Sequence, residues 1–366
     1  MTRIIPVLLI LILIFPLMIA AQDQSLPNAQ VAFMESRLMV RREPFLDALA
    51  VGYVESGAVI IVTGRSADNL WLETTAENGA RGWVNADFVR VIMDLPNIPV
   101  THSRNLIGIT IDLAPEVVQN IRRIFLLGQG SGNHADVFSK VGDSITVAPH
   151  SYAPIAADDY NAGNFYYFQD TVDHFLAGEA RDGNPFVNPS LAAAIGWSSF
   201  AVLSPRYTNT DYCLENEILL DCEYRLNRPA FALIMFGTND VGFMSQSNFY
   251  GNMERIVQIS LEQNIIPILT TIPPRRDFEN QSAAFNDVIV RIADRYDVPL
   301  WDYGAAMRAL PQNGLDVDGV HPSIPPMGLR GAADFRTYNL RYGYVIRNLT
   351  ALQILDAVWT AVQASQ

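Results

Sequence analysis

The pattern of apolar and polar residues changes in character near residue 100. Before this point, short β-branched and aromatic runs alternate with clusters of turn residues. The apolar runs are 59–63, 70–72 and 82–84, and the turn clusters are 64–69 and 77–79. Short strands with frequent turn signals are typical of a small all-β barrel. We therefore predict an all-β domain over 28–92, followed by a Pro-containing linker over 93–103.

From residue 104 onward, amphipathic helical segments alternate with short, wholly apolar runs. The predicted strands cover 135–139, 231–236, 265–270 and 298–301, and the predicted helices cover 115–124, 252–263, 283–296 and 338–362. Gly128, Gly130 and Gly132 are predicted to form a loop. Apolar strands that alternate with helices indicate a parallel sheet covered on both faces. One α/β domain over 104–366 is the expected arrangement.

The first residues have the pattern of a targeting segment. Arg3 is the only charge before an uncharged apolar run over 4–21, which ends in two alanines and is followed by polar residues. This is typical of a secretory signal peptide, here residues 1–21, and predicts a secreted or cell-envelope protein. A retained membrane anchor is the alternative, because the run is close to the ~18 residues that can span a bilayer.

Charge and cysteine content narrow the class of protein. The formal net charge is −13 and no basic run occurs, which argues against nucleic acid as a partner. Cys213 and Cys222 are the only cysteines, and in an exported chain such a pair is most simply one disulfide. No zinc-binding motif is present, so neither a structural nor a catalytic zinc site is expected.

A serine follows the first predicted strand of the α/β segment, in Gly142-Asp143-Ser144. A hydroxyl at the carboxyl end of a strand, after a glycine that permits a sharp turn, projects into a crevice at the sheet edge. Serine alone is a poor nucleophile. It needs a base, a group that orients the base, and donors for an oxyanion.

Two further motifs can supply those groups. Gly237-Thr238-Asn239-Asp240 ends the strand over 231–236, so the Asn239 amide could donate to an oxyanion at the same edge. A turn with local side-chain hydrogen bonds is the alternative interpretation of that motif. Asp318-Gly319-Val320-His321 places an acceptor three residues before a histidine, which suits a base and its orienting carboxylate. His150 is the rival base, and Asp316 is the rival orienting residue.

These three motifs, in this order, resemble the SGNH (GDSL-type) hydrolase family. The resemblance implies a flavodoxin-like three-layer α/β/α sandwich with a parallel sheet, and acyl-ester chemistry without a cofactor. It implies Ser144 as nucleophile, His321 as base and Asp318 as its orienting residue. It also implies an oxyanion hole made by Asn239, the Ser144 N–H and a glycine of a further motif.

The sequence departs from the family at that further motif, where an Asn-x-Gly pattern is usual. The best candidate is Gly196 in Ala194-Ile195-Gly196-Trp197-Ser198, which could equally be a helix-end or packing glycine. An α/β-hydrolase is disfavoured because the chain has no Gly-x-Ser-x-Gly elbow.

The N-terminal segment resembles bacterial SH3-like domains. The matching parts are Leu38-Met39-Val40-Arg41, Gly64-Arg65-Ser66 with Trp71, and Gly82-Trp83-Val84-Asn85-Ala86. Met39 and Glu43 depart from the residues usual in that family, although Pro44 remains. Such modules often bind cell-wall peptides or glycans, so the domain is expected either to contact the cell wall or to act as a spacer.

Together these features predict a secreted serine esterase. The expected substrate is an acylated small molecule or glycan, with O-acetyl groups on carbohydrate or cell-envelope polymers as the leading class. An acyltransferase to a glycan with the same residues is one alternative. A wall-binding protein with a vestigial catalytic site is the other.

Overall fold

The computed structural model describes residues 28–32, 37–41, 44, 50–66, 71–92, 98–102 and 113–363. The predicted signal peptide over 1–21 and Glu43 lie outside the described residues. The β-rich and α/β parts of the chain each have a hydrophobic core of their own. Within the described ranges, no helix has both the length and the apolar character needed to cross a membrane.

In the described residues before position 103, the chain forms one 3₁₀ turn, Ala86–Phe88, and short strands. They are β1 (Ala29–Val31), β2 (Leu38–Arg41), β3 (Ala50–Val54), β4 (Val59–Ile60), β5 (Gly64–Ser66), β6 (Trp71–Thr75), β7 (Arg81–Asn85), β8 (Val89–Val91) and β9 (Val100–His102). One sheet has the order β3-β2-β7-β6-β5-β9 and the other has the order β4-β1-β8. Alternate side chains of these strands are buried in a small core that includes Val40, Leu72 and Val84.

Two strands of this part lie where the sequence predicted irregular structure. β5 occupies the start of the predicted turn cluster over 64–69, and β9 lies inside the predicted linker over 93–103. β5 pairs with β6 and, in parallel, with β9, and the Arg65 side chain also donates to the Ile98 carbonyl. The sequence pattern did not indicate β5, because its residues are glycine and polar residues. Backbone pairing with β6 and β9, rather than burial of apolar side chains, holds this strand in place. The SH3-like assignment and the domain boundaries stay predictions.

The sheet of the α/β part is parallel. Its strands are β10 (His134–Gly142), β11 (Pro229–Met235), β12 (Ile266–Thr270) and β13 (Leu300–Trp301), in the order β10-β11-β12-β13. Ala193 forms a parallel bridge with Gly142 on the other side of β10. With that bridge counted as the second strand position along the chain, the order is 2-1-3-4-5, that of flavodoxin-like folds. The predicted fold class is confirmed.

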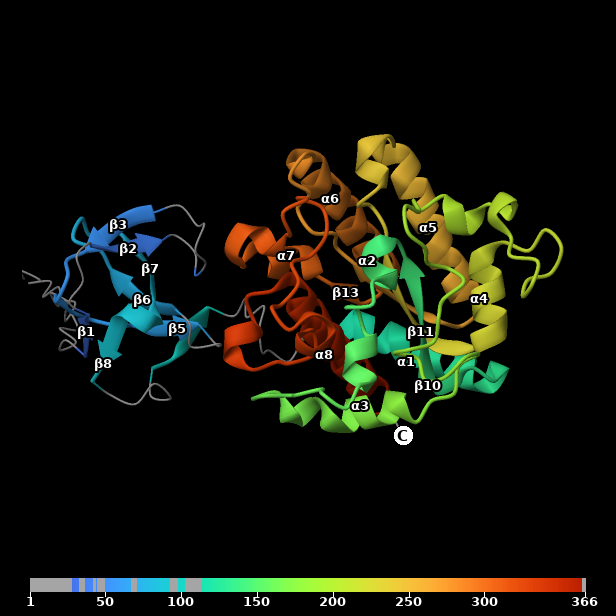
Figure 1. Cartoon of the computed structure of the whole chain (residues 1–366), viewed down its shortest axis with the longest axis horizontal. Coiled ribbons are helices and arrows are strands. Elements are labelled where there is room, and N and C mark those ends of the chain that lie inside the picture. Colours follow the sequence, from blue (N-terminus) through green and yellow to red (C-terminus); the bar gives the residue numbers. More distant parts are fainter. Residues whose placement is uncertain are drawn as a thin grey trace, which may run out of the picture.

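Helices cover both faces of this sheet. They are α1 (Pro115–Ser131), α2 (Ser144–Val147), α3 (Gln169–Leu176), α4 (Leu219–Asn227), α5 (Gln246–Glu262), α6 (Glu279–Tyr296), α7 (Tyr303–Arg308) and α8 (Gly343–Gln363). α1, α3 and α8 pack together on one face, and α5 and α6 pack together on the other (Figure 1). α8 is buried around almost its whole circumference, which places polar side chains such as Arg347 inside the core.

The loop predicted at Gly128, Gly130 and Gly132 is wrong for the first two glycines, which lie inside α1. A Cβ at Gly128 would lie 2.5 Å from the carbonyl oxygen of Asn264, so this glycine permits close packing of the helix. Gly132 ends α1 with φ 84°, a left-handed conformation that glycine adopts without strain. Of the three glycines, only Gly132 lies outside the helix, where the loop was predicted.

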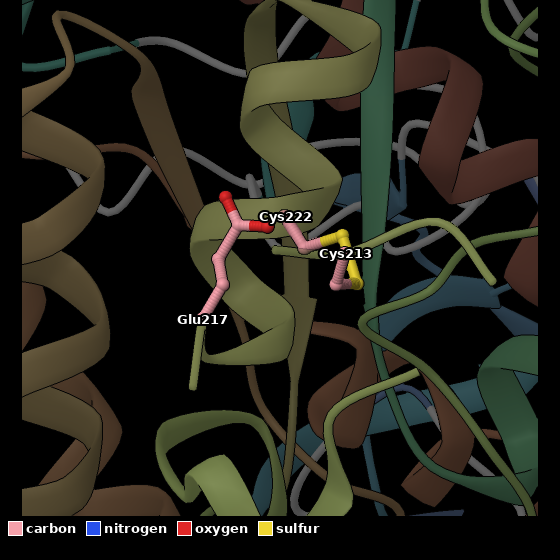
Figure 2. Close-up of side chains that lie close together, drawn as sticks. All are labelled: Cys213, Glu217 and Cys222. Carbon is pink, nitrogen blue, oxygen red and sulfur yellow. A yellow bond between two sulfur atoms is a disulfide. The ribbon is translucent and has the colours of Figure 1, made fainter. Parts of the chain in front are cut away.

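Cys213 and Cys222 form a disulfide in the part of the chain that leads into α4. Figure 2 shows Glu217 beside the two sulfur atoms. The Glu217 carboxylate accepts two hydrogen bonds from Arg225, and both sulfurs are bonded to each other, so this cluster offers no thiolate to a metal ion. The disulfide links the loop at Cys213 to the first turn of α4 at Cys222.

Candidate active site

Ser144 lies at the carboxyl edge of the parallel sheet. β10 ends at Gly142, and Ser144 is the first residue of the short helix α2. Asp143 caps that helix, because its Oδ1 accepts the Ile145 N–H at 2.9 Å. This turn leaves the Ser144 side chain half-buried at the sheet edge, rather than inside the core.

The predicted base and its predicted orienting residue lie beside this serine. Ser144 Oγ and His321 Nε2 are 3.0 Å apart, and His321 Nδ1 and Asp318 Oδ2 are 2.6 Å apart. The three side chains therefore form one continuous hydrogen-bonded line, although 177 residues separate the serine from the histidine. This is the geometry that nucleophilic catalysis by serine requires.

Asp318 holds more than the imidazole ring. Its Oδ1 accepts the backbone N–H groups of Val320 at 2.9 Å and His321 at 3.0 Å. Burial alone would raise the pKa of Asp318, but these hydrogen bonds and the His321 ring together lower it below its ordinary value. Asp318 is therefore a carboxylate at neutral pH, and its position fixes both the backbone and the ring of the histidine.

The rival residues do not occupy these positions. The Asp316 carboxylate accepts the Val317 N–H, and no hydrogen bond between it and His321 is present in the described structure. The His150 ring packs against Tyr344, with ring centroids 5.2 Å apart. Burial lowers the pKa of His150, which disfavours its charged form. The geometry favours Asp318 over Asp316 and His321 over His150.

The predicted oxyanion residues Asn239 and Gly196 lie on two loops that contact each other. Asn239 Nδ2 donates to the Trp197 carbonyl at 2.8 Å, which uses one of its two amide protons. Gly196 occupies the third position of the turn from Ala194 to Trp197 and has φ 77°, as a type II turn requires. It precedes no helix directly, and a Cβ there would meet no atom within 4 Å, so backbone conformation rather than packing explains this glycine.

A buried carboxylate joins these two loops, and sequence reasoning missed it. Asp240 is fully buried, and its Oδ1 accepts both the N–H and the hydroxyl of Ser199, at 2.9 and 2.6 Å. Its Oδ2 accepts the N–H of Gly237 at 3.1 Å. Asp240 thus ties the Gly196 segment to the Asn239 segment. The sequence signal was only an aspartate next to Asn239, with nothing to indicate its partner 41 residues away.

Two arginines brace the same edge and were also missed. Arg276 donates to the carbonyls of Asp316 and Val317, and its backbone N–H donates to the carbonyl of Gly319. Arg275 donates to the Thr238 carbonyl at 2.7 Å. These contacts connect the segment after β12 to the loops that carry Asp318 and Asn239.

Buried charges lie behind the serine. The Asp143 side chain is fully buried, and burial raises its pKa to about 6, although the Ile145 N–H and the charge of Arg347 act in the opposite direction. The Thr238 hydroxyl also lowers this pKa, but neither it nor Asp143 Oδ2 has a regular hydrogen bond in the described structure. Arg347 is fully buried and donates to Tyr152 at 2.8 Å.

A family model describing GDSL-like lipases and acylhydrolases matches residues 141–324, more than half of the chain. The chain belongs to the GDSL-like lipase/acylhydrolase family. The matched span contains Ser144, Gly196, Asn239, Asp318 and His321. Membership of this family makes the protein a hydrolase that acts on esters. No curated protein sequence matches the chain.

Solved structures of the same kind are similar to the chain. A lipase/acylhydrolase from Enterococcus faecalis has 18% identity and a TM-score of 0.38, and the alignment covers 60% of this chain and 94% of that one. A psychrotrophic esterase from Pseudoalteromonas sp., inhibited by monoethylphosphonate, has 16% identity and a TM-score of 0.37, with 63% and 98% covered. Because these TM-scores are low, the family assignment rests on the family model.

Asp143→Asn tests the buried carboxylate. In the folded state the pKa of Asp143 is raised from 3.8 to about 6, so the wild-type fold loses stability as pH rises through this interval. The change corresponds to roughly 3 kcal/mol. Asparagine keeps the shape and the acceptor for Ile145 but cannot ionise. We expect the free energy of unfolding of the variant, relative to wild type, to increase by up to this amount between pH 4 and pH 7.5.

Urea unfolding at the two pH values measures this difference. Asp211→Asn, at an exposed position, is the control for removal of one carboxylate charge. If the difference between Asp143→Asn and wild type stays constant with pH, the carboxylate of Asp143 does not carry a raised pKa.

Proposed function

We propose that the protein is a serine esterase that uses Ser144 as nucleophile, His321 as base and Asp318 as the residue that orients the base. The observation that carries this proposal is the hydrogen-bonded line from Ser144 through His321 to Asp318 at the sheet edge. In a chain of the GDSL-like lipase/acylhydrolase family, that line supports an acyl-enzyme mechanism.

In the first half of the reaction, Ser144 Oγ attacks the ester carbonyl and His321 Nε2 takes its proton. The imidazolium that forms is stabilised by the Asp318 carboxylate on Nδ1. His321 then gives the proton to the leaving alcohol. In the second half, water attacks the acyl-enzyme and His321 takes a proton from that water. His321 then gives this proton to Ser144 Oγ as the acyl–oxygen bond breaks, which releases the carboxylic acid and restores the serine.

The negative charge on the carbonyl oxygen needs donors. The Asn239 amide has one proton that is not directed at Trp197, and the N–H groups of Gly196 and Ser144 complete the proposed oxyanion hole. The Asp240 carboxylate holds the Gly196 and Asn239 segments together through Ser199 and Gly237. Donors fixed in advance in this way lower the barrier because they need no reorganisation during the reaction.

The proposed substrate is an acyl ester, with O-acetyl groups on carbohydrate or cell-envelope polymers as the leading class. Exposed apolar side chains adjoin the proposed catalytic loops: Ile195 next to Gly196, Phe243 close to Asn239 and Val317 next to Asp318. The targeting pattern over 1–21 and the SH3-like pattern over 28–92 favour a substrate outside the cytoplasm.

The triad variants give the first test, with p-nitrophenyl acetate as substrate. His321→Ala removes proton transfer from every step, and Asp318→Asn favours the wrong imidazole tautomer. Each should lower kcat by roughly 10³-fold or more, and the double variant should be little worse than the single variants, because the residues act as one unit. His150→Ala and Asp316→Asn are the matched controls. An active His321→Ala variant beside an inactive His150→Ala variant would overturn the assignment of the base.

Asn239→Ala separates the oxyanion donor from the base. Its hydrogen bond strengthens only as the oxyanion forms, so kcat should fall by about 10²–10³ with little change in KM. Asn248→Ala, at an exposed position of α5, is the control for loss of an asparagine. If Asn239→Ala raises KM and leaves kcat unchanged, Asn239 binds the substrate in its ground state and is not an oxyanion donor.

A further inference from the structure

Lys140 is the only lysine in the 366-residue chain. The chain has 25 lysine and arginine residues in total, and the other 24 are arginines. It lies on β10, four residues before Ser144, and only 8% of its surface is exposed. Lysine is almost never buried unless it is paired, because removal of an ammonium group from water is costly. The buried ammonium group of Lys140 therefore needs a partner, either within the protein or on a ligand.

The protein supplies only part of what this ammonium group needs. Nζ donates to the Phe186 carbonyl at 2.9 Å and lies 5.8 Å from the centre of the Tyr152 ring. Burial lowers the pKa of Lys140 to about 8, and the charge of Glu223 offsets this only in part. The Glu223 carboxylate is occupied by Ser139 and the Leu191 N–H. In the described structure Lys140 forms no direct ion pair, and the Phe186 carbonyl is the one protein acceptor for its three N–H groups.

A cavity of about 520 Å³ lies against this lysine. Its lining includes Lys140 and Phe186, Val147 at the end of α2, and Ala194 and Ile195 just before Gly196. The lining is otherwise mainly apolar. The cavity therefore reaches from the buried ammonium group to the helix that begins at Ser144 and to the turn that carries Gly196.

The size of the cavity suits part of a small ester. Ser144 follows Lys140 by four residues, which separate the two Cα atoms by at most about 14 Å, so a chain of several bonds can link a group at Lys140 to an ester at Ser144. A neutral alkyl chain in the cavity would strip the remaining water from the ammonium group and return no hydrogen bond. A carboxylate would return charge-assisted hydrogen bonds.

We propose that this cavity is a substrate subsite in which Lys140 binds a carboxylate carried by the ester, several bonds from the scissile bond. The inference rests on the proposed esterase function and names its substrate class. The formal net charge of −13 disfavours binding of a polyanion, so the ligand is a single carboxylate on a small acyl group or on one sugar residue. Lys140 is a specificity-determining residue in this proposal.

Because Lys140 is unique, it can be observed directly in the whole protein. Biosynthetic ¹³C-lysine labelling places one lysine side-chain signal in the NMR spectrum. Glutarate should shift this signal and raise the pKa read from it, whereas the neutral glutaramide should do neither. A signal that glutarate leaves unmoved would overturn the proposal without reference to catalysis.

Kinetics test the same subsite with two substrate series. In the first, p-nitrophenyl monoesters of succinate, glutarate, adipate and suberate are compared with alkanoate esters of equal length. In the second, 6-acetoxyhexanoate is compared with hexyl acetate by release of acetate. The wild type should prefer the carboxylate member in one series, and that series shows whether the acyl or the alcohol part enters the cavity.

Lys140→Met keeps the volume and removes the charge. It should lower kcat/KM for the preferred carboxylate member by about 10- to 100-fold and so abolish the preference over the neutral member. Val187→Trp, on the exposed wall of the cavity, should raise KM for the same member with the lysine intact. The proposal fails if the wild type has no preference in either series or if Lys140→Met retains it.

Hydrolysis of p-nitrophenyl acetate by the wild type distinguishes failure of the proposed subsite from failure of the proposed esterase function. A wild type that cleaves this ester but ignores the carboxylates refutes the subsite and leaves the esterase function intact. A wild type that does not cleave any of these esters refutes the proposed function itself.

Discussion

The hydrogen bonds that Asp318 makes with His321 are the contacts on which the rest of the site depends. One carboxylate oxygen holds the imidazole ring, and the other holds the backbone N–H groups of Val320 and His321. Rotation of the ring by a modest angle would break the 3.0 Å contact between Nε2 and Ser144. The loop around Asp318 is in turn braced by Arg276, so the geometry of the triad depends on a segment that follows another strand.

The sequence predicted those parts of the site that local motifs define. A glycine and an acidic residue next to a serine, an asparagine after a buried strand, and an Asp-x-x-His segment each lie at the carboxyl edge of the sheet, as expected. The strands were readable because burial on both faces leaves them almost wholly apolar. Gly128 was misread because close packing, which favours glycine inside a helix, leaves no local signal, whereas a Cβ at Gly130 would meet no atom within 4 Å and packing does not explain that glycine.

The contacts that could not be predicted join residues far apart in the sequence. Asp240 and Ser199, Arg276 and Val317, and Lys140 and Phe186 are ordinary residue types whose partners only the folded chain brings together. The same holds for Arg347, which is buried and donates to Thr146 and Tyr152, because α8 is buried around almost its whole circumference. These buried polar groups bind the loops to the sheet core. Lys140 stands out because its buried charge has the Phe186 carbonyl as its one protein acceptor and no direct ion pair in the described structure.

The central claim is that Ser144 is the nucleophile of an acyl-enzyme mechanism, and covalent labelling tests it most directly. The protein would be treated with a phosphonofluoridate and analysed by intact-mass and peptide mass spectrometry. The account predicts one phosphonyl group per chain on the peptide that contains Ser144, and none in Ser144→Ala or after denaturation. An unlabelled wild type, or a label on another serine that persists in Ser144→Ala, would contradict it.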